Sequence, residues 1–498
     1  MDGPGGPLSR TGIAIIGAGA GGLCAAAQLR LAGYDDFVVL ERSDGVGGTW
    51  RDNTYPDAAC DVPSHFYSFS FATNPDWTRK WAKQPEILAY FESLVDRFDL
   101  AQHLRFGVEV TEATWSDEDC NWTVRTAGGE SWVASVVVSA LGQLNMPHVP
   151  AIPGLEDFDG TRFHSARWDH RHDLDGEAVG VIGIGASAIQ FVPPVAREAG
   201  TVTLFQRSAN YVVPKPDREF RPWERWVFRN VPAAEKAYRA WTYWRLETKF
   251  SLMRRESRLG RWLQSRFRRE LAAMADERLP MEVLMPDYPP GCRRLLISDD
   301  WYPTLRRDNV EVVGSGVSRI TPDGLDTADG RHFRLDTLIF GTGFRTTEFL
   351  TPLKVTGSNG RDLNEVWDGG AVAYMGIAVS GFPNLFILYG PNTNLGHNSI
   401  LFMIEQQVQY LLAALEQLQR RGAAALDVKP GALEAWDDEM RTRSEETVWA
   451  GDCSSWYKTD DGRITNNWVG HTTEYRRRMR APAWDDWRFI RAEPTNRS

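Results

Sequence analysis

Two glycine-rich stretches of the sequence each follow a short apolar run and precede a helical pattern. In the first, Gly17 permits a tight turn, Gly19 lets the backbone approach a pyrophosphate, and Gly22 lets the helix pack closely on the strand. The next apolar run, Phe37–Leu40, ends in Glu41, which lies 24 positions after Gly17. At that spacing a carboxylate accepts hydrogen bonds from ribose hydroxyls. A glycine pattern alone also occurs at ordinary turns, but the flanking strands and the acid together predict a dinucleotide site.

The second stretch has Gly183, Gly185 and Ala188 in the same relative positions, again before a helical run. The strand pattern that follows, at 202–205, leads to Arg207 and Ser208 and not to an acid. A carboxylate would repel a 2′-phosphate, whereas a guanidinium pairs with it. We therefore predict FAD at the first site and NADPH at the second. The alternative for Arg207 is an ordinary surface arginine at a strand end.

Positioning two such sites requires an α/β fold with two Rossmann-like dinucleotide-binding domains. Apolar runs at 136–140 and 337–340 meet Gly142 and Gly341, and we interpret these junctions as crossings between the domains, although each is also an ordinary strand end. We expect the NADPH domain to be nested in the FAD domain. The FAD domain would comprise residues 1–145 and 336–498, including a C-terminal segment. The NADPH domain would comprise residues 146–335, with a helical insertion at about 215–285.

Composition narrows the class of protein further. The 498 residues carry a formal net charge of −10, which argues against a nucleic-acid partner because no global basic field exists to neutralise phosphates. No apolar run is long enough to span a bilayer, and residues 1–10 lack the pattern of a signal peptide. We therefore expect a cytoplasmic protein with no transmembrane segment.

The cysteines exclude further classes. All five are scattered, and none forms a C-x-x-C pair. This spacing excludes a zinc ribbon, predicts no metal site and argues against a disulfide framework. It also removes the redox-active pair that a flavin disulfide reductase needs, so a reductase or dehydrogenase is disfavoured.

A longer pattern lies between the two glycine turns: Phe158-x-Gly160-x-x-x-His164-x-x-x-Trp168-Asp169. It resembles, at every position, the fingerprint of the type I Baeyer–Villiger monooxygenases. Related N- and S-oxidising flavin monooxygenases usually carry another aromatic residue at the position of Trp168. The resemblance covers nearly the whole chain and implies an NADPH-dependent FAD enzyme that inserts one oxygen atom of O₂ next to a ketone carbonyl, giving an ester or lactone. We assign His164 and Trp168 to packing and positioning at the domain junction.

The same resemblance implies roles for individual residues. Arg294 would stabilise a C4a-peroxyflavin and the alkoxide that follows, since a guanidinium cannot lose its proton to them, and Asp61 is the carboxylate that pairs with this arginine. Arg293 would contact the 2′-phosphate of NADPH; the alternative for both arginines is an ordinary surface loop. The other positions carried over are cofactor contacts, namely Thr49, Trp50, Tyr67 and Val110 for FAD and Trp456 for NADPH.

Two of these inferences stay open. Trp456, in a C-terminal loop, is nearly as well explained as an ordinary buried aromatic. Members of the family often have an arginine at position 59, where this sequence has Ala59, which puts some nicotinamide-side contacts in doubt.

The predicted insertion is rich in tryptophan and arginine. Trp223 and Trp226, and likewise Trp241 and Trp244, are spaced by three residues, which places each pair on one helical face. One interpretation is a membrane-surface helix; we favour an amphipathic subdomain that covers the substrate entrance.

Two rival functions come from other classes. A flavin monooxygenase that attacks nitrogen or sulfur is disfavoured by Trp168 and Arg294, and a non-catalytic redox sensor would not need the Asp61–Arg294 pair. The partners we expect are a small-molecule ketone and O₂. The sequence leaves the identity of the ketone and the oligomeric state open.

Overall fold

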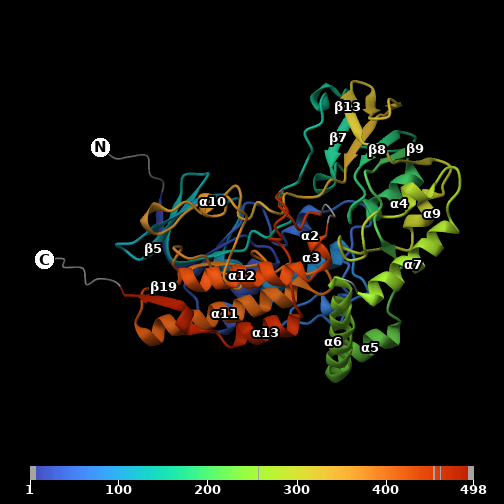
Figure 1. Cartoon of the computed structure of the whole chain (residues 1–498). Helices are drawn as coiled ribbons and strands as arrows, with labels where there is room; N and C mark the ends of the chain where they lie inside the picture. The colour runs from blue at the N-terminus through green and yellow to red at the C-terminus, as the bar shows by residue number, and fades with distance from the viewer. Residues whose placement is uncertain (1–6, 256, 452–454, 460, 492–498) are drawn as a thin grey trace.

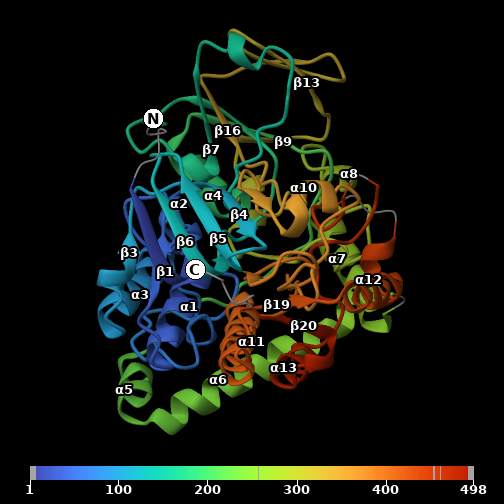
Figure 2. The same cartoon turned by 90° about the vertical axis from the view of Figure 1, so that its left-hand side faces the viewer.

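The computed structural model describes residues 7–255, 257–451, 455–459 and 461–491. Two domains lie side by side, each built around a sheet rich in parallel strands, and the ends of the described chain both lie on the first domain (Figure 1). Seen from the side, helices α5, α6 and α13 lie along one end of the molecule, opposite the small sheet that contains β13 (Figure 2). The α/β class and the division into two domains predicted from the sequence are confirmed.

The first sheet has the strand order β17-β4-β5-β6-β1-β2-β3, with β18 paired to β6. Its central strands are parallel and buried on both faces, which explains why the sequence shows unbroken apolar runs there and no alternation. The chain leaves this sheet after β6, builds the second sheet, and returns at β17, so the second domain is nested in the first, as predicted. The strands are β1 (Leu8–Ile16), β2 (Phe37–Leu40), β3 (Leu104–Arg105), β4 (Val110–Ser116), β5 (Asn121–Thr126), β6 (Ser131–Ser139), β17 (Lys354–Thr356) and β18 (Leu385–Ile387).

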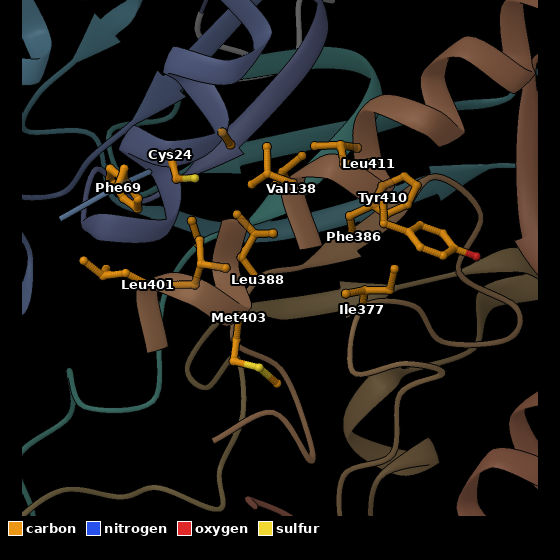
Figure 3. Packing of buried hydrophobic residues seen from close by; sticks show 14 of the residues in the cluster. Cys24, Phe69, Val138, Ile377, Phe386, Leu388, Leu401, Met403, Tyr410 and Leu411 are labelled. Carbon is orange, nitrogen blue, oxygen red and sulfur yellow. The ribbon is translucent and has the colours of Figure 1, made fainter. Parts of the chain in front are cut away.

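Helices from both ends of the chain cover the first sheet. Helix α11 (Ile400–Arg421) packs against α1 (Ala20–Leu31), so the core joins residues nearly 400 positions apart, as Cys24, Val138, Phe386 and Leu411 illustrate in Figure 3. The other elements of this domain are α2 (Thr49–Asp52), α3 (Gln84–Arg97), α10 (Leu363–Val366), α12 (Pro430–Glu445), α13 (Thr472–Arg480), β19 (Ala425–Val428) and β20 (Trp487–Ile490).

The second sheet is wholly parallel, with the order β12-β9-β8-β16-β7. Its elements are β7 (Thr161–His164), β8 (Ala178–Ile182), α4 (Ala188–Glu198), β9 (Thr201–Phe205), α9 (Trp301–Leu305), β12 (Val310–Val313) and β16 (Thr337–Phe340). The sequence placed 337–340 in the returning part of the FAD domain, and this was wrong. Strand β16 lies between β8 and β7, so the return to the first domain comes after Phe340.

The second domain also contains several smaller elements outside its main sheet. The helices of the segment 215–285 are α5 (Pro222–Asn230), α6 (Pro232–Glu247), α7 (Arg258–Ala272) and α8 (Met281–Leu284). A two-stranded pair joins β10 (Val212–Val213) to β11 (Leu296–Ile297), and an antiparallel meander contains β13 (Val317–Thr321), β14 (Gly324–Thr327) and β15 (His332–Arg334).

Two expectations drawn from the composition concern membrane-spanning segments and disulfide bonds. Over the described ranges, no helix combines the length and apolar character needed to cross a membrane. Cys24, Cys60 and Cys120 are free and buried, whereas Cys292 is disulfide-bonded, a bond that the scattered spacing of the cysteines did not predict.

Candidate active site

A cavity of about 1180 Å³ lies where the two glycine turns face each other across the domain boundary. It exceeds the roughly 300–1,000 Å³ of most small-molecule sites, in keeping with two dinucleotides. All but two of the predicted site residues line it, namely Gly17, Gly19, Glu41, Thr49, Trp50, Asp61, Tyr67, Val110, Gly183, Gly185, Arg207, Ser208, Arg293, Arg294 and Trp456. The exceptions, Gly22 and Ala188, are buried outside the cavity and contribute to packing, not to its surface.

The first glycine turn lies between β1 and α1. Gly17 has a φ of 101°, and a side chain there would come within 2.9 Å of the Ala140 carbonyl oxygen. A Cβ at Gly22 would lie 1.9 Å from the Gly17 carbonyl oxygen, so only glycine lets the first turn of α1 approach the strand this closely. This geometry leaves the backbone of Gly19 on the cavity wall at the N-terminus of α1, where free N–H groups attract phosphate.

Glu41 follows β2 at the edge of the same cavity. Its carboxylate is buried and accepts hydrogen bonds from the backbone N–H groups of Ala18 (2.7 Å) and Ser43 (2.8 Å). These two bonds fix the carboxylate beside the glycine turn and leave it with unused lone pairs. Glu41 can therefore accept ribose hydroxyls, as predicted for the FAD site.

The second glycine turn has the same arrangement, but the strand that follows it leads to basic residues and not to an acid. Arg207 and Ser208, just after β9, line the cavity together with Arg293 from a distant loop. Arg293 donates a hydrogen bond from Nη1 to Ser208 Oγ at 2.7 Å, and its guanidinium lies 4.5 Å from the centre of the Tyr288 ring. Two arginines and a hydroxyl thus meet where the acid stands in the first site, and this group suits a 2′-phosphate.

Arg294 and Asp61 meet on the wall between the two turns. Arg294 Nη2 lies 2.9 Å from Asp61 Oδ2, and both side chains line the cavity. Burial by itself lowers the pKa of Arg294, but the charge of Asp61 together with Tyr457, Cys60 and Tyr389 outweighs this effect and holds the pKa above its ordinary value. The guanidinium is therefore a permanent cation in the cavity, held by a carboxylate 233 positions away in the sequence.

The residues predicted to contact FAD give the cavity an aromatic and polar lining. Trp50 of α2 donates a hydrogen bond from Nε1 to the Tyr67 hydroxyl (2.9 Å), and the two rings pack edge to face. Burial raises the pKa of Tyr67 well above its ordinary value, so its hydroxyl stays protonated. Thr49, at the start of α2, and Val110, at the start of β4, complete this wall. Together these residues offer a rigid surface to a flat ring system.

Trp456 lies at the rim of the cavity, in the loop near the end of the described chain. Its ring is 4.4 Å from that of Tyr457, and its carbonyl oxygen accepts hydrogen bonds from Thr346 Oγ1 (2.9 Å) and Asn466 Nδ2 (3.0 Å). These bonds fix the backbone of the loop, and Trp456 is one of the residues that line the cavity. The predicted role of Trp456 as a cover for NADPH is compatible with this position and stays a prediction.

His164 and Trp168 do not line the cavity. His164 ends β7, and its Nδ1 accepts the backbone N–H of Ala166; burial lowers its pKa to about 4, so it is neutral. Trp168 packs on Phe191 of α4, with ring centres 5.3 Å apart. The assignment of both residues to packing and positioning is compatible with these contacts and stays a prediction.

Gln190, on α4, is a site residue that the sequence did not reveal. Its side-chain amide accepts a hydrogen bond from Ala59 N and donates one to Ala59 O, both at 3.1 Å. It also accepts one from the Tyr55 hydroxyl. The amide therefore ties the loop that carries Asp61 to the second domain through the backbone of Ala59. Because its partner is a backbone segment, no sequence pattern marks it.

Both the sequence and the structure of this chain are similar to those of known proteins. The profile of a family described as pyridine nucleotide-disulphide oxidoreductase matches residues 14–243. A Baeyer–Villiger monooxygenase of Streptomyces coelicolor is 45% identical over 97% of this chain and 93% of its own length. A steroid monooxygenase bound to NADP has a similar structure, with a TM-score of 0.86 and 31% identity over 97% of this chain and all of that one. OTEMO in complex with FAD and NADP aligns with a TM-score of 0.87 and 25% identity over 96% and 99% of the two chains.

The chain belongs to the Baeyer–Villiger monooxygenases. It is an NADPH-dependent flavoprotein enzyme, and the prediction of FAD and NADPH from the two glycine turns is confirmed. The matched family profile does not make it a disulfide reductase. Within residues 14–243, all of which the structure describes, the only cysteines are Cys24, Cys60 and Cys120, and each is free.

Proposed function

We propose that this enzyme oxidises a ketone to an ester or lactone, with Arg294 as the catalytic cation. One observation carries the proposal: a permanently charged guanidinium, fixed by Asp61, lies in the cavity between the two dinucleotide sites. Attack on a ketone carbonyl places negative charge first on the attacking oxygen and then on the carbonyl oxygen. A preorganised positive donor in a cavity shielded from water lowers the energy of both.

The bound flavin, once reduced by NADPH, supplies the activation of O₂. The chain supplies everything around it. Glu41 and the first glycine turn would hold the FAD ribose and pyrophosphate, while Arg207, Ser208 and Arg293 would hold the 2′-phosphate of NADPH. Arg294 faces the space between them and cannot act as an acid, so it stabilises charge without moving a proton.

The test is NADPH consumption that depends on both O₂ and substrate, measured against linear, cyclic and polycyclic ketones and against matched amines and sulfides. We expect consumption with at least one class of ketone, and an ester or lactone that is 16 mass units heavier than its ketone, the mass of about one oxygen atom. Products oxidised at nitrogen or sulfur, with no ester from any ketone, would assign the chain to heteroatom oxygenation. NADPH oxidation that no substrate stimulates would point to the redox-sensor alternative.

A further inference from the structure

Four tryptophans of helices α5 and α6 are exposed to solvent. Trp223 and Trp226 of α5 are 60% and 62% exposed, and Trp241 and Trp244 of α6 are 54% and 58% exposed. Soluble proteins seldom leave several large aromatic side chains of neighbouring helices uncovered. The interpretation of this segment as a subdomain that covers the substrate entrance stays a prediction, because the exposure of the four indoles does not test it. The four tryptophans form an outward face.

Helix α6 has an outer face as apolar as its inner one. Glu235, Thr242 and Leu246 are buried against the domain. The exposed face opposite them is formed by small and aromatic apolar residues, namely Ala233, Ala237, Ala240, Trp241 and Trp244. A helix of a soluble protein normally turns charged residues outward. We call the exposed apolar residues of α5 and α6 the tryptophan face.

Exposed basic side chains flank the tryptophan face, namely Arg221 before α5 and Lys236 and Arg245 on α6. Residues 218–272 contain 15 Arg and Lys against 6 Asp and Glu, although the whole chain has a net charge of −10. Arg245 lies 4.9 Å from the centre of the Trp241 ring. Exposed Arg476 and Arg477 are on α13, which is joined to α6 by the hydrogen bond between Tyr243 Oη and Thr472 Oγ1 (3.0 Å).

The face is rigidly attached to the enzyme. Arg239, on the inner side of α6, donates hydrogen bonds to Ser68 Oγ (2.6 Å) and to the carbonyl oxygens of His65 and Ser68. Both views place α5, α6 and α13 at the same end of the molecule (Figures 1 and 2). Whatever binds the tryptophan face is therefore held in a fixed orientation relative to the whole enzyme.

The charges decide what binds there. A second copy of the chain would bring two arginine-rich surfaces together, which is unfavourable. An anionic bilayer offers phosphate groups to the arginines and an interfacial layer in which indole rings are favoured. We propose that the tryptophan face docks the enzyme on an anionic lipid surface as a peripheral protein, with α5 and α6 lying in the plane of the headgroups.

The test uses the FAD-loaded enzyme and flotation with vesicles of phosphatidylcholine alone or mixed with phosphatidylglycerol. We expect binding to the mixed vesicles, weakened by salt, and little binding to phosphatidylcholine alone. The combined variant Trp223→Gln/Trp226→Gln/Trp241→Gln/Trp244→Gln should bind about tenfold more weakly or worse. It should keep its FAD, its melting temperature and its activity on a water-soluble ketone. The matched control is Trp262→Gln, an indole 53% exposed on α7 outside this face, and it should bind as the wild type does.

Three outcomes would overturn the proposal. Wild-type enzyme that stays with neither kind of vesicle removes the lipid partner. Binding that is unchanged in the four-tryptophan variant places the contact elsewhere. Sedimentation that shows a dimer in the wild type and a monomer in that variant, without vesicle binding, assigns the face to a second copy of the chain. A combined variant that has lost FAD is replaced by Arg476→Glu/Arg477→Glu, which should weaken binding to mixed vesicles at least several-fold; unchanged binding by it also rejects the proposal.

Discussion

Replacing Arg294 with alanine should separate flavin reduction from ketone oxidation. Reduction of the flavin needs NADPH in its own site. The residues expected to bind the 2′-phosphate of NADPH, namely Arg207, Ser208 and Arg293, are unchanged in this variant. Attack on the ketone loses the cation that lies 2.9 Å from Asp61. Removing one preorganised donor from a developing oxyanion costs about 3–4 kcal/mol, a factor of roughly 10²–10³ in rate. Asp61 also becomes a carboxylate without its partner, and its charge then opposes the developing anion.

Stopped-flow absorbance measures flavin reduction, and product analysis measures ketone oxidation. We expect Arg294→Ala to be reduced by NADPH, to release hydrogen peroxide, and to form almost no ester. Arg294→Lys should recover little, because an ammonium lacks the planar fork and loses its proton more easily when buried. Asp61→Ala should resemble Arg294→Ala, and the double variant should be less than additive because the two residues act as one pair. Ester formation by Arg294→Ala at a rate close to the wild type would refute the assignment and make Arg293 the next candidate.

Three further predictions follow from the contacts. Arg207→Ala should lower the NADPH-to-NADH ratio of kcat/KM by about one to two decades, since a guanidinium–phosphate contact contributes roughly 1.5–3 kcal/mol; an unchanged ratio would remove Arg207 from the site. Gly22→Ala should lower FAD content and reduce the free energy of unfolding by about 1–3 kcal/mol, whereas Gly431→Ala, where an added Cβ meets nothing within 4 Å, should not, and equal melting temperatures would contradict the close-packing argument. Gln190→Leu frees the Ala59 backbone and should raise the fraction of NADPH lost to hydrogen peroxide about tenfold, with the coenzyme ratio unchanged; a changed ratio would mean that Gln190 acts on NADPH binding and not on the Asp61 loop.

Features that depend on residues close together in the sequence could be predicted. The turns at Gly17 and Gly183 and the strands beside them depend on residues within about 25 positions, because a glycine turn, its helix and the next strand form one compact unit. Their order also sufficed to predict that the second domain is nested in the first.

Features that depend on distant partners were harder to predict. The pairing of Arg294 with Asp61 came from the resemblance to a family, since nothing in the spacing of two residues 233 positions apart indicates contact. Strand β16 was assigned to the wrong domain because a buried strand ending in glycine has the same sequence pattern in either sheet. The tryptophans of α6 were predicted on one face, but three-residue spacing cannot say whether that face is inside or outside.

The most direct measurement of the central claim is the fate of labelled oxygen. The enzyme turns over an accepted ketone under ¹⁸O₂ in ordinary water, and the ester is analysed by mass spectrometry. Insertion of one atom of O₂ beside the carbonyl predicts one ¹⁸O in the ring or alkoxy position of the ester, with the carbonyl oxygen unlabelled. An ester without the label, or with the label only in the carbonyl group, would contradict the account.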